Sequence, residues 1–243
     1  MATAQKEIIS IKAPEFEIIN VKLVGDTPLI VHAWDAKAKR EILEKEVFGS
    51  KKVQKRETKN PIADFAASMY WLTPMPDEFT AESVANSLEN GARFGFPATA
   101  IKQCAISAAY WQKWSRDKTT LRTAFNIIAD AHGYYGGDLR IDMEKKAIDI
   151  IPNQFKAYDM VEIISDPPVM REDMVKVGQG SADIRYRGEF QNWSINLKVS
   201  FNKNGPYSKS DVFNIIQAGG YACGIGEWRN ERDGVNGAFH IES

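Results

Sequence analysis

The chain has 243 residues, of which 44% are hydrophobic, and its 31 basic and 32 acidic residues leave a net charge of -1. This composition excludes a disordered polar chain and is sufficient for a well-formed apolar core. The near-zero charge also excludes a global positive field that would draw the whole molecule onto a polyanion, so any surface for nucleic acid must be local.

The two cysteines, Cys104 and Cys223, have no second thiol at metal-ligand spacing, which argues against a zinc site. No run approaches the ~18 apolar residues of a membrane span, and the first residues lack the apolar core of a signal peptide. We therefore expect a protein of the reducing cytoplasm with no metal, no cofactor and no membrane partner.

The first third of the chain predicts a strand pair, a helix and a basic segment. Residues 15–31 are rich in Ile and Val around a Gly-Asp-Thr-Pro turn, which predicts a strand, a turn and a second short apolar segment. Asp35 can cap a helix over 36–48. From Lys37 to Lys59 there are nine basic and four acidic residues, and we expect 49–60 to form an exposed loop.

The middle of the chain predicts a block of helices. Pro61 suits a first helical turn, Thr80 suits a cap, and Pro97 opens an amphipathic helix that reaches Trp111. The apolar spacing of Leu121, Phe125 and Ile128 predicts a fourth helix. We interpret about 61–131 as a helical insertion in a single domain that spans residues 1–243.

The last part predicts strands and one helix. Short strands are expected at 139–141 and 148–150, and residues 193–201 alternate without a break, with odd positions facing a core and even positions facing water or a ligand. A helix is expected from about Ser210. The fold class is therefore α+β, with an antiparallel sheet open on one face.

The stretch from Gly219 to Gly237 holds six glycines in nineteen residues, whereas the whole chain holds 17. That density indicates positive φ angles or close backbone approach. In one interpretation the loop offers amides to a phosphate, with Gly224 and Gly226 shaping it, Arg229 and Arg232 supplying charge and Trp228 a stacking face. In the other it is a hairpin in which Arg229 pairs with Glu227 or Glu231.

Two further groups of cations are candidates for phosphate contact. Arg185 and Arg187 flank Tyr186 in a predicted strand, so both would project from one face, with Lys198 on a neighbouring strand. The alternative is cross-strand pairing with acids. The predicted basic loop offers a second group, which is either an arm that wraps a phosphate backbone or a neighbouring copy of the chain, or a solvated charge run: Lys51, Lys52, Lys55 and Arg56.

A helix that runs into a Gly-rich segment and a final short strand, after a ferredoxin-like pattern of strands and helices, resembles the RAMP superfamily, the RNA-binding backbones of CRISPR effector complexes. The motifs GDTPLIVH, FGFPATAIKQCAISAA, ADIRYRGEFQNW and GIGEWRNERDG together are similar to uncharacterised tailed-bacteriophage proteins. The resemblance implies a ferredoxin/RRM-like sheet and a glycine-rich loop near the RNA-contacting face, at Gly219, Gly220, Gly224 and Gly226. This loop departs from the family in carrying three acids: Glu227, Glu231 and Asp233.

These observations predict a phage-encoded, sequence-independent binder of single-stranded DNA or RNA in the bacterial host cytoplasm, which forms homo-oligomers and is not an enzyme. Two alternatives stay open. The resemblance implies a RAMP-type endoribonuclease with His32 as general base, although a buried structural histidine fits the same position. The third possibility is a protein-interaction factor, such as an assembly factor or an inhibitor of host defence.

Overall fold

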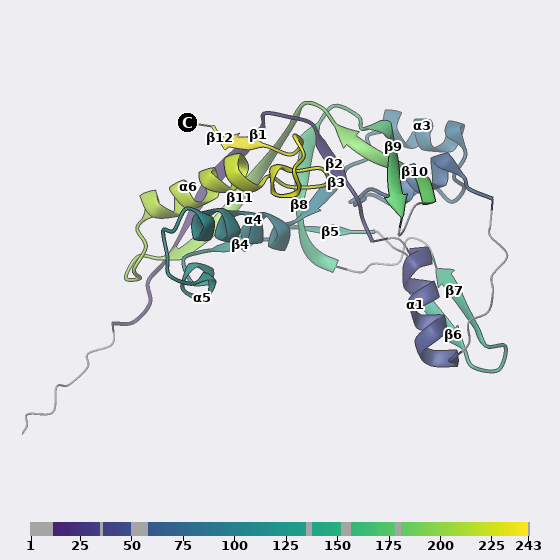
Figure 1. The fold of residues 1–243 in the computed structure, drawn as a ribbon, viewed down its shortest axis with the longest axis horizontal. Helices are drawn as coiled ribbons and strands as arrows, with labels where there is room; N and C mark the ends of the chain where they lie inside the picture. The colour runs from purple at the N-terminus through teal and green to yellow at the C-terminus, as the bar shows by residue number, and fades with distance from the viewer. Residues whose placement is uncertain are drawn as a thin grey trace, which may run out of the picture.

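The computed structural model describes residues 12–34, 36–49, 58–134, 138–151, 157–177 and 181–242. The centre of the fold is a seven-stranded sheet whose neighbouring strands are all antiparallel (Figure 1). Its main path runs in the order β12 (Phe239–Ile241), β1 (Phe16–Gly25), β11 (Trp193–Asn202), β8 (Ala157–Ser165) and β3 (Phe94–Pro97). Two short strands join this path, β4 (Asn126–Ile128) on β11 and β5 (Ala131–Gly133) on β8.

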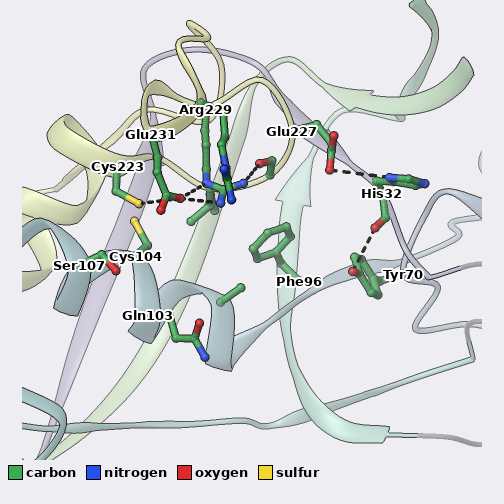
Figure 2. Close-up of a pocket in the computed structure, with 15 residues that line it drawn as sticks. His32, Tyr70, Phe96, Gln103, Cys104, Ser107, Cys223, Glu227, Arg229 and Glu231 are labelled. Carbon is green, nitrogen blue, oxygen red and sulfur yellow. Dashed lines mark hydrogen bonds and ion pairs between the residues drawn. The ribbon is translucent and has the colours of Figure 1, made fainter. Parts of the chain in front are cut away.

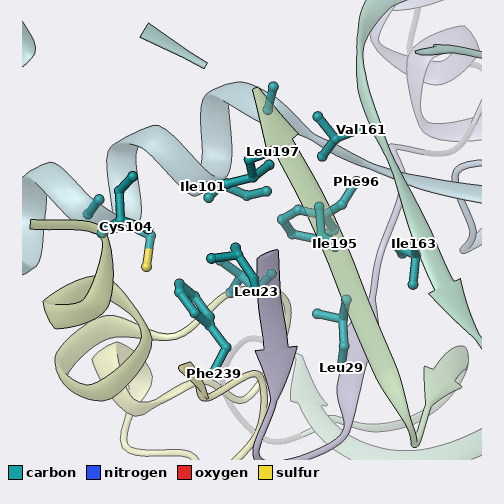
Figure 3. Close-up of a cluster of buried hydrophobic side chains, with 14 of the residues drawn as sticks. Leu23, Leu29, Phe96, Ile101, Cys104, Val161, Ile163, Ile195, Leu197 and Phe239 are labelled. Atoms are coloured by element: carbon teal, nitrogen blue, oxygen red, sulfur yellow. The ribbon is translucent and has the colours of Figure 1, made fainter. Parts of the chain in front are cut away.

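Alternation of apolar and polar residues gives the sheet one buried face. In β11 the odd positions from Trp193 to Phe201 are buried, while Asn196 and Lys198 are exposed. Helices α4 (Ala98–Trp111) and α6 (Lys209–Ala218) pack against each other over the buried face (Figure 1). Side chains from the strands and from α4 meet in the core between them (Figure 3), including Leu23, Ile101, Ile195, Leu197 and Phe239. Among the described residues, the opposite face is exposed at Asn20 of β1 and at Asn196 and Lys198 of β11, in agreement with the predicted alternation.

A second, three-stranded sheet has the order β2 (Leu29–Val31), β10 (Ser181–Phe190) and β9 (Val169–Val177). Helix α2 (Pro61–Ala67) packs on β10, and α3 (Ala81–Glu89) packs on α2. A hairpin of β6 (Asp138–Asp142) and β7 (Ala147–Ile151) contacts α1 (Ala36–Phe48).

Capping residues in the sequence determine where several helices begin. Thr80 forms a capping box with Ser83 at the start of α3, and Ser208 forms one with Asp211 at the start of α6. Each box satisfies backbone N–H groups that the first turn leaves without a partner. The predicted helices at 36–48, after Thr80, from Pro97 and near Ser210 are confirmed, as are the strands at 139–141, 148–150 and 193–201.

The predicted fourth helix through Ile128 is wrong. Helix α5 (Lys118–Arg122) ends after five residues, and Asn126–Ile128 continue as β4 along β11, with Ile127 opposite Val199. The two β-branched isoleucines fit a strand beside another strand, and this pairing outweighed the helical spacing of the apolar residues. The stretch 61–131 thus holds four helices and also the strands β3 and β4, which belong to the main sheet.

Candidate functional site

The Gly-rich loop, residues 219–237, begins where α6 ends and returns the chain to β12. Its first turn, Gly219–Cys223, is a π-helical turn, and Asn230–Arg232 form a short 3-10 turn. Isolated π turns recur at functional sites. Gly224 (φ 73°) and Gly226 (φ 80°) both lie in the left-handed region that favours glycine. The Glu227 amide donates to the carbonyl of Ile30 at 2.8 Å, which ties the loop to β2.

A first cavity of about 380 Å³ lies between this loop and α4 (Figure 2). Arg229 lines it but is engaged within the loop. Its guanidinium donates to Glu231 Oε2 at 2.5 and 2.8 Å and to the carbonyl of Gly226 at 2.9 Å. Burial acts to lower the pKa of Arg229, but the hydrogen bond to Glu231, the charge of Glu231 and the Cys223 thiol together raise it. This is the pairing that the second interpretation of the loop predicted, although the segment is built from turns and is not a hairpin.

The other predicted loop residues lie closer to solvent. Arg232 is exposed at the rim of the first cavity and makes no ion pair with any residue that the structure describes. Trp228 is 39% exposed and adopts a positive φ of 53°, but it does not line the cavity. Arg232 is therefore the loop cation best placed to meet an anion.

A second cavity of about 470 Å³ lies beside the first, and His32 lines both. Two aromatic side chains, Trp34 and Tyr186, line the second cavity. It also contains four cations and three carboxylates: Lys37, Lys59, Arg185, Arg187, Glu41, Asp64 and Asp183. Lys59 pairs with Asp183 at 2.7 Å, and Arg185 lies 3.7 Å from the same residue. The hydrogen bond from Lys59 lowers the pKa of Asp183.

Arg187 and Glu227 connect the two cavities. Arg187 Nη2 lies 3.6 Å from Glu227 Oε2, and His32 Nδ1 lies 3.7 Å from Glu227 Oε1 (Figure 2 shows the His32 contact). Tyr70 donates its hydroxyl to the carbonyl of His32 at 3.3 Å. The nearby His32 ring lowers the pKa of Glu227, and the charge of Arg187 adds to this effect. The structure thereby joins the Gly-rich loop to β10.

Arg187 itself is a buried member of an ion-pair network. Its side chain is 3% exposed and lies 3.2 Å from Asp173 on β9, which also accepts from Arg171 at 2.9 Å. Arg171 donates in turn to Glu189 at 2.8 Å, and this bond raises the pKa of Arg171. The prediction that Arg185 and Arg187 share a face holds, but Arg187 makes the cross-strand pairs of the alternative interpretation and not a solvent-facing site.

Lys198 lies elsewhere. The expectation that it sits on a strand next to Arg185 and Arg187 is wrong, because β11 belongs to the seven-stranded sheet and β10 to the three-stranded one. The two strands are consecutive in the chain, but the bend after Phe190 sends them into different sheets. Lys198 is exposed on the open face of β11 and pairs with Asp130 at 3.3 Å. Lys51, Lys52, Lys55 and Arg56 lie outside the described residues.

The three histidines are dispersed. His32 is exposed and not buried in the core, His132 lies in β5, and His240 lies in β12 beside Asp26 at 2.6 Å. Across the described residues, no group of three or more His, Cys, Asp or Glu side chains is arranged to hold a metal ion.

Sequence reasoning missed the second cavity. Trp34, Lys59 and Tyr186 meet there from a strand end, a helix start and a distant strand, and no spacing in the chain signals that meeting. The high basic content of 37–59 and the two arginines that flank Tyr186 were the available hints.

Comparison with known proteins adds no assignment. No family model matches the chain, and no curated protein matches it either. Among the residues that the structure describes, no helix is both long enough and apolar enough to cross a membrane.

Proposed function

We propose that this protein binds single-stranded nucleic acid without sequence specificity, and that the strand lies across the two cavities that meet at His32. The second cavity carries the proposal. It combines the aromatic rings of Trp34 and Tyr186 with cations at Lys59 and Arg185. Stacking faces beside backbone-binding cations are the common features of sequence-tolerant single-strand sites. Trp34 is 57% exposed, and with Lys39 Nζ 5.4 Å from the centroid on one side of the ring, the exposed part of the indole is available to a base.

The cations of the site are interspersed with carboxylates. A polyanion would therefore be recognised by individual contacts and by the shape of the cavities, not by a large positive field. Four cations and three carboxylates line the second cavity, and Arg232 stands at the rim of the first. Carboxylates such as Asp183 hold the cations in place before the nucleic acid binds. Phosphates would then compete for Lys59 and Arg185 in an exposed setting, where ion pairs contribute about 0–1 kcal/mol each.

The strand order supports the ferredoxin/RRM-like part of the proposal. If β1, β8, β11 and β12 are counted as the first to fourth strands of the unit, the sheet order is fourth, first, third, second. Helix α4 precedes β8 and α6 precedes β12, as in a β-α-β-β-α-β unit. In this interpretation the chain is a RAMP-like protein of bacteriophage origin, acting in the host cytoplasm, and its copies assemble side by side along the strand.

Fluorescence anisotropy with labelled single strands tests the proposal. The probes are oligo(dT) and oligo(rU) of about 16 nucleotides, titrated over a salt series. We expect binding at low salt that weakens as salt rises. The variant Lys59→Ala/Arg185→Ala removes two cations of the second cavity. Its log–log salt slope should be shallower by about 1.4, since each phosphate contact on a single strand contributes about 0.7.

The matched control is Lys22→Ala/Lys203→Ala. Both lysines are exposed and paired with carboxylates, Lys22 with Glu242 at 2.9 Å and Lys203 with Glu15 at 3.1 Å, but they lie outside both cavities. The control makes the same change in net charge and should bind as the wild type does. No binding at low salt, or an equal loss in both double variants, would reject the proposed cleft. Light scattering with and without the oligonucleotide tests side-by-side assembly.

One observation favours a second function, that of a RAMP-type endoribonuclease. His32 is exposed, faces both cavities and has Glu227 3.7 Å from Nδ1, which could orient the ring as a general base. Incubation of labelled RNA with wild-type protein and with His32→Ala decides this function. Cleavage by the wild type that His32→Ala abolishes supports it, and absence of cleavage in both removes it.

A further inference from the structure

The two cysteines of the chain, far apart in sequence, meet on one wall of the first cavity. Cys104 comes from α4 and Cys223 ends the π-helical turn that opens the Gly-rich loop. Both residues line the first cavity, and Figure 2 shows the two sulfur atoms facing each other across the gap between these elements. Cys104 Sγ also lies 3.2 Å from the carbonyl oxygen of Gly219. Packing of the π-helical turn on α4 thus places both thiols on the same wall of the first cavity.

The surroundings make the two thiols unequal. The neighbouring Cys104 thiol lowers the pKa of Cys223, and the guanidinium of Arg229 acts in the same direction, while burial and Glu231, 3.7 Å away, oppose them. The neighbouring Cys223 thiol and burial raise the pKa of Cys104. Since the thiolate is the reactive form, Cys223 is the nucleophile of the pair and Cys104 is the thiol poised to react second.

Access to the pair is selective by size. Cys104 is 4% exposed and Cys223 2% exposed, so neither is open to a bulky reagent at the surface. Both nevertheless line the first cavity, whose volume of about 380 Å³ is many times the ~30 Å³ that one water occupies in the liquid. An oxidant of nearly the size of water can reach the sulfurs, whereas a tripeptide disulfide such as oxidised glutathione is hindered.

We propose that Cys104 and Cys223 are a peroxide-sensitive pair that closes to an intramolecular disulfide between α4 and the start of the Gly-rich loop. In the first step the Cys223 thiolate attacks one oxygen of hydrogen peroxide. The O–O bond breaks, Cys223 becomes a sulfenic acid and hydroxide leaves. In the second step the sulfur of Cys104 attacks the Cys223 sulfur, the S–O bond breaks and water leaves. Two thiols and one peroxide give one disulfide and two waters.

The bond has a defined mechanical consequence. It links α4, which packs in the core, to Cys223 in the first turn of the Gly-rich loop. The loop therefore moves less freely relative to the wall of the first cavity. A small dithiol that enters the cavity reverses the bond by thiol–disulfide exchange. The inference does not rest on nucleic-acid binding, because it concerns only these two thiols and their surroundings.

Mass spectrometry of the wild-type protein tests the inference. The folded protein is treated with a small excess of hydrogen peroxide, the peroxide is removed, the protein is unfolded in urea so that unreacted thiols can be blocked with a maleimide, and intact and digested samples are measured. We expect loss of both free thiols, loss of two hydrogens from the intact mass, and one cross-linked peptide pair containing Cys104 and Cys223. Oxidised glutathione at the same concentration should leave both thiols free.

The variant Cys104→Ser identifies the order of the two steps. With no second thiol, oxidation of Cys223 should stop at the sulfenic acid, which dimedone traps as a covalent adduct. Cys223→Ser should yield no adduct at Cys104 under the same conditions. If either variant fails to fold, the cross-linked peptide of the wild type still decides the inference.

Three results would overturn the proposal. The first is that both thiols of the folded wild type survive peroxide while the urea-unfolded protein reacts. The second is oxidation of Cys223 to the sulfinic acid without a cross-link. The third is a disulfide between two copies of the chain, visible as a dimer on a non-reducing gel.

Discussion

Arg187 and Glu227 form an ion pair of 3.6 Å that joins β10 to the Gly-rich loop, and the arginine is almost fully buried. Asp173 holds the same guanidinium from β9 at 3.2 Å. One cation therefore fixes three segments of the chain that are distant in sequence. It also forms the boundary between the two cavities, because Arg187 lines the second and Glu227 lines the first.

Arg187→Met should destabilise the fold strongly. The substitution keeps much of the side-chain volume but leaves Glu227 and Asp173 without their shared cation. Removing one partner of a buried pair costs about 3–5 kcal/mol. The value expected here is near the lower end, since Arg171 still pairs with Asp173. Urea unfolding followed by far-UV circular dichroism measures the loss.

Arg185→Met is the matched control for that measurement. Arg185 lies on the same face of β10, but it is 40% exposed and its nearest carboxylate oxygen is 3.7 Å away. Exposed ion pairs contribute about 0–1 kcal/mol, so this variant should unfold close to the wild-type midpoint. Equal midpoints for Arg187→Met and the wild type would contradict the structural role assigned to Arg187.

Glu227 should make the stability of the protein depend on pH in the acid range. Its pKa is lowered in the folded state, chiefly by His32 and then by Arg187, relative to an ordinary value of 4.5. A lowered folded pKa means that the contribution is complete above the unfolded value and is lost as pH falls through the folded one. Urea midpoints measured from pH 7 to about pH 3 should therefore fall less steeply in Glu227→Gln than in the wild type.

The control for this pH series is Glu82→Gln, on the exposed first turn of α3. It should reproduce the wild-type profile, because no cation holds this carboxylate in an ion pair within the described residues. Parallel profiles for Glu227→Gln and the wild type would show that the His32–Glu227–Arg187 contacts contribute nothing to folding.

Much of the fold follows from local signals, and the cases that failed show where those signals end. Thr80 and Ser208 begin helices because their side chains cap the first turn, and β11 forms because Trp193, Ile195 and Leu197 alternate with polar residues. Asn126–Ile128 form a strand for a different reason, the presence of β11 alongside, and that neighbour is not visible in the local sequence.

The candidate site was predictable in its loop and in the Arg185 and Arg187 pair of β10. The glycine density identified residues 219–237, and positive φ angles at Gly224 and Gly226 agree with it. The partners of the loop depend on tertiary packing. Nothing near Glu227 in the sequence indicates that Arg187 will reach it, and nothing near Cys104 indicates Cys223. Long-range contacts of this kind determine which charges remain available to a ligand.

Gly226→Ala should be far more costly than the same change at Gly91. Gly226 has a φ of +80° and Gly91 a φ of +81°, so both substitutions incur the left-handed strain of about 1–2 kcal/mol. A Cβ at Gly91 meets nothing within 4 Å, whereas one at Gly226 would collide with the carbonyl oxygen of Ile30. Overpacking adds about 1–3 kcal/mol. Thermal unfolding of both variants tests this, and similar losses in both would mean that the loop moves away from β2 at little cost.

Trp34→Ala should weaken binding of single strands without altering its dependence on salt. The ring lines the second cavity and is 57% exposed, so its removal costs little stability but deletes a stacking face. Stacking of one base on an aromatic ring contributes about 1–3 kcal/mol, which corresponds to a rise in Kd of roughly 5- to 150-fold. The salt slope should stay the same, because an indole carries no charge to exchange with counterions.

Trp114→Ala removes a ring of similar exposure, 51%, that lines neither cavity, and it should bind as the wild type does. Equal losses in the two variants, measured by anisotropy on the same oligonucleotide, would place the strand elsewhere on the molecule.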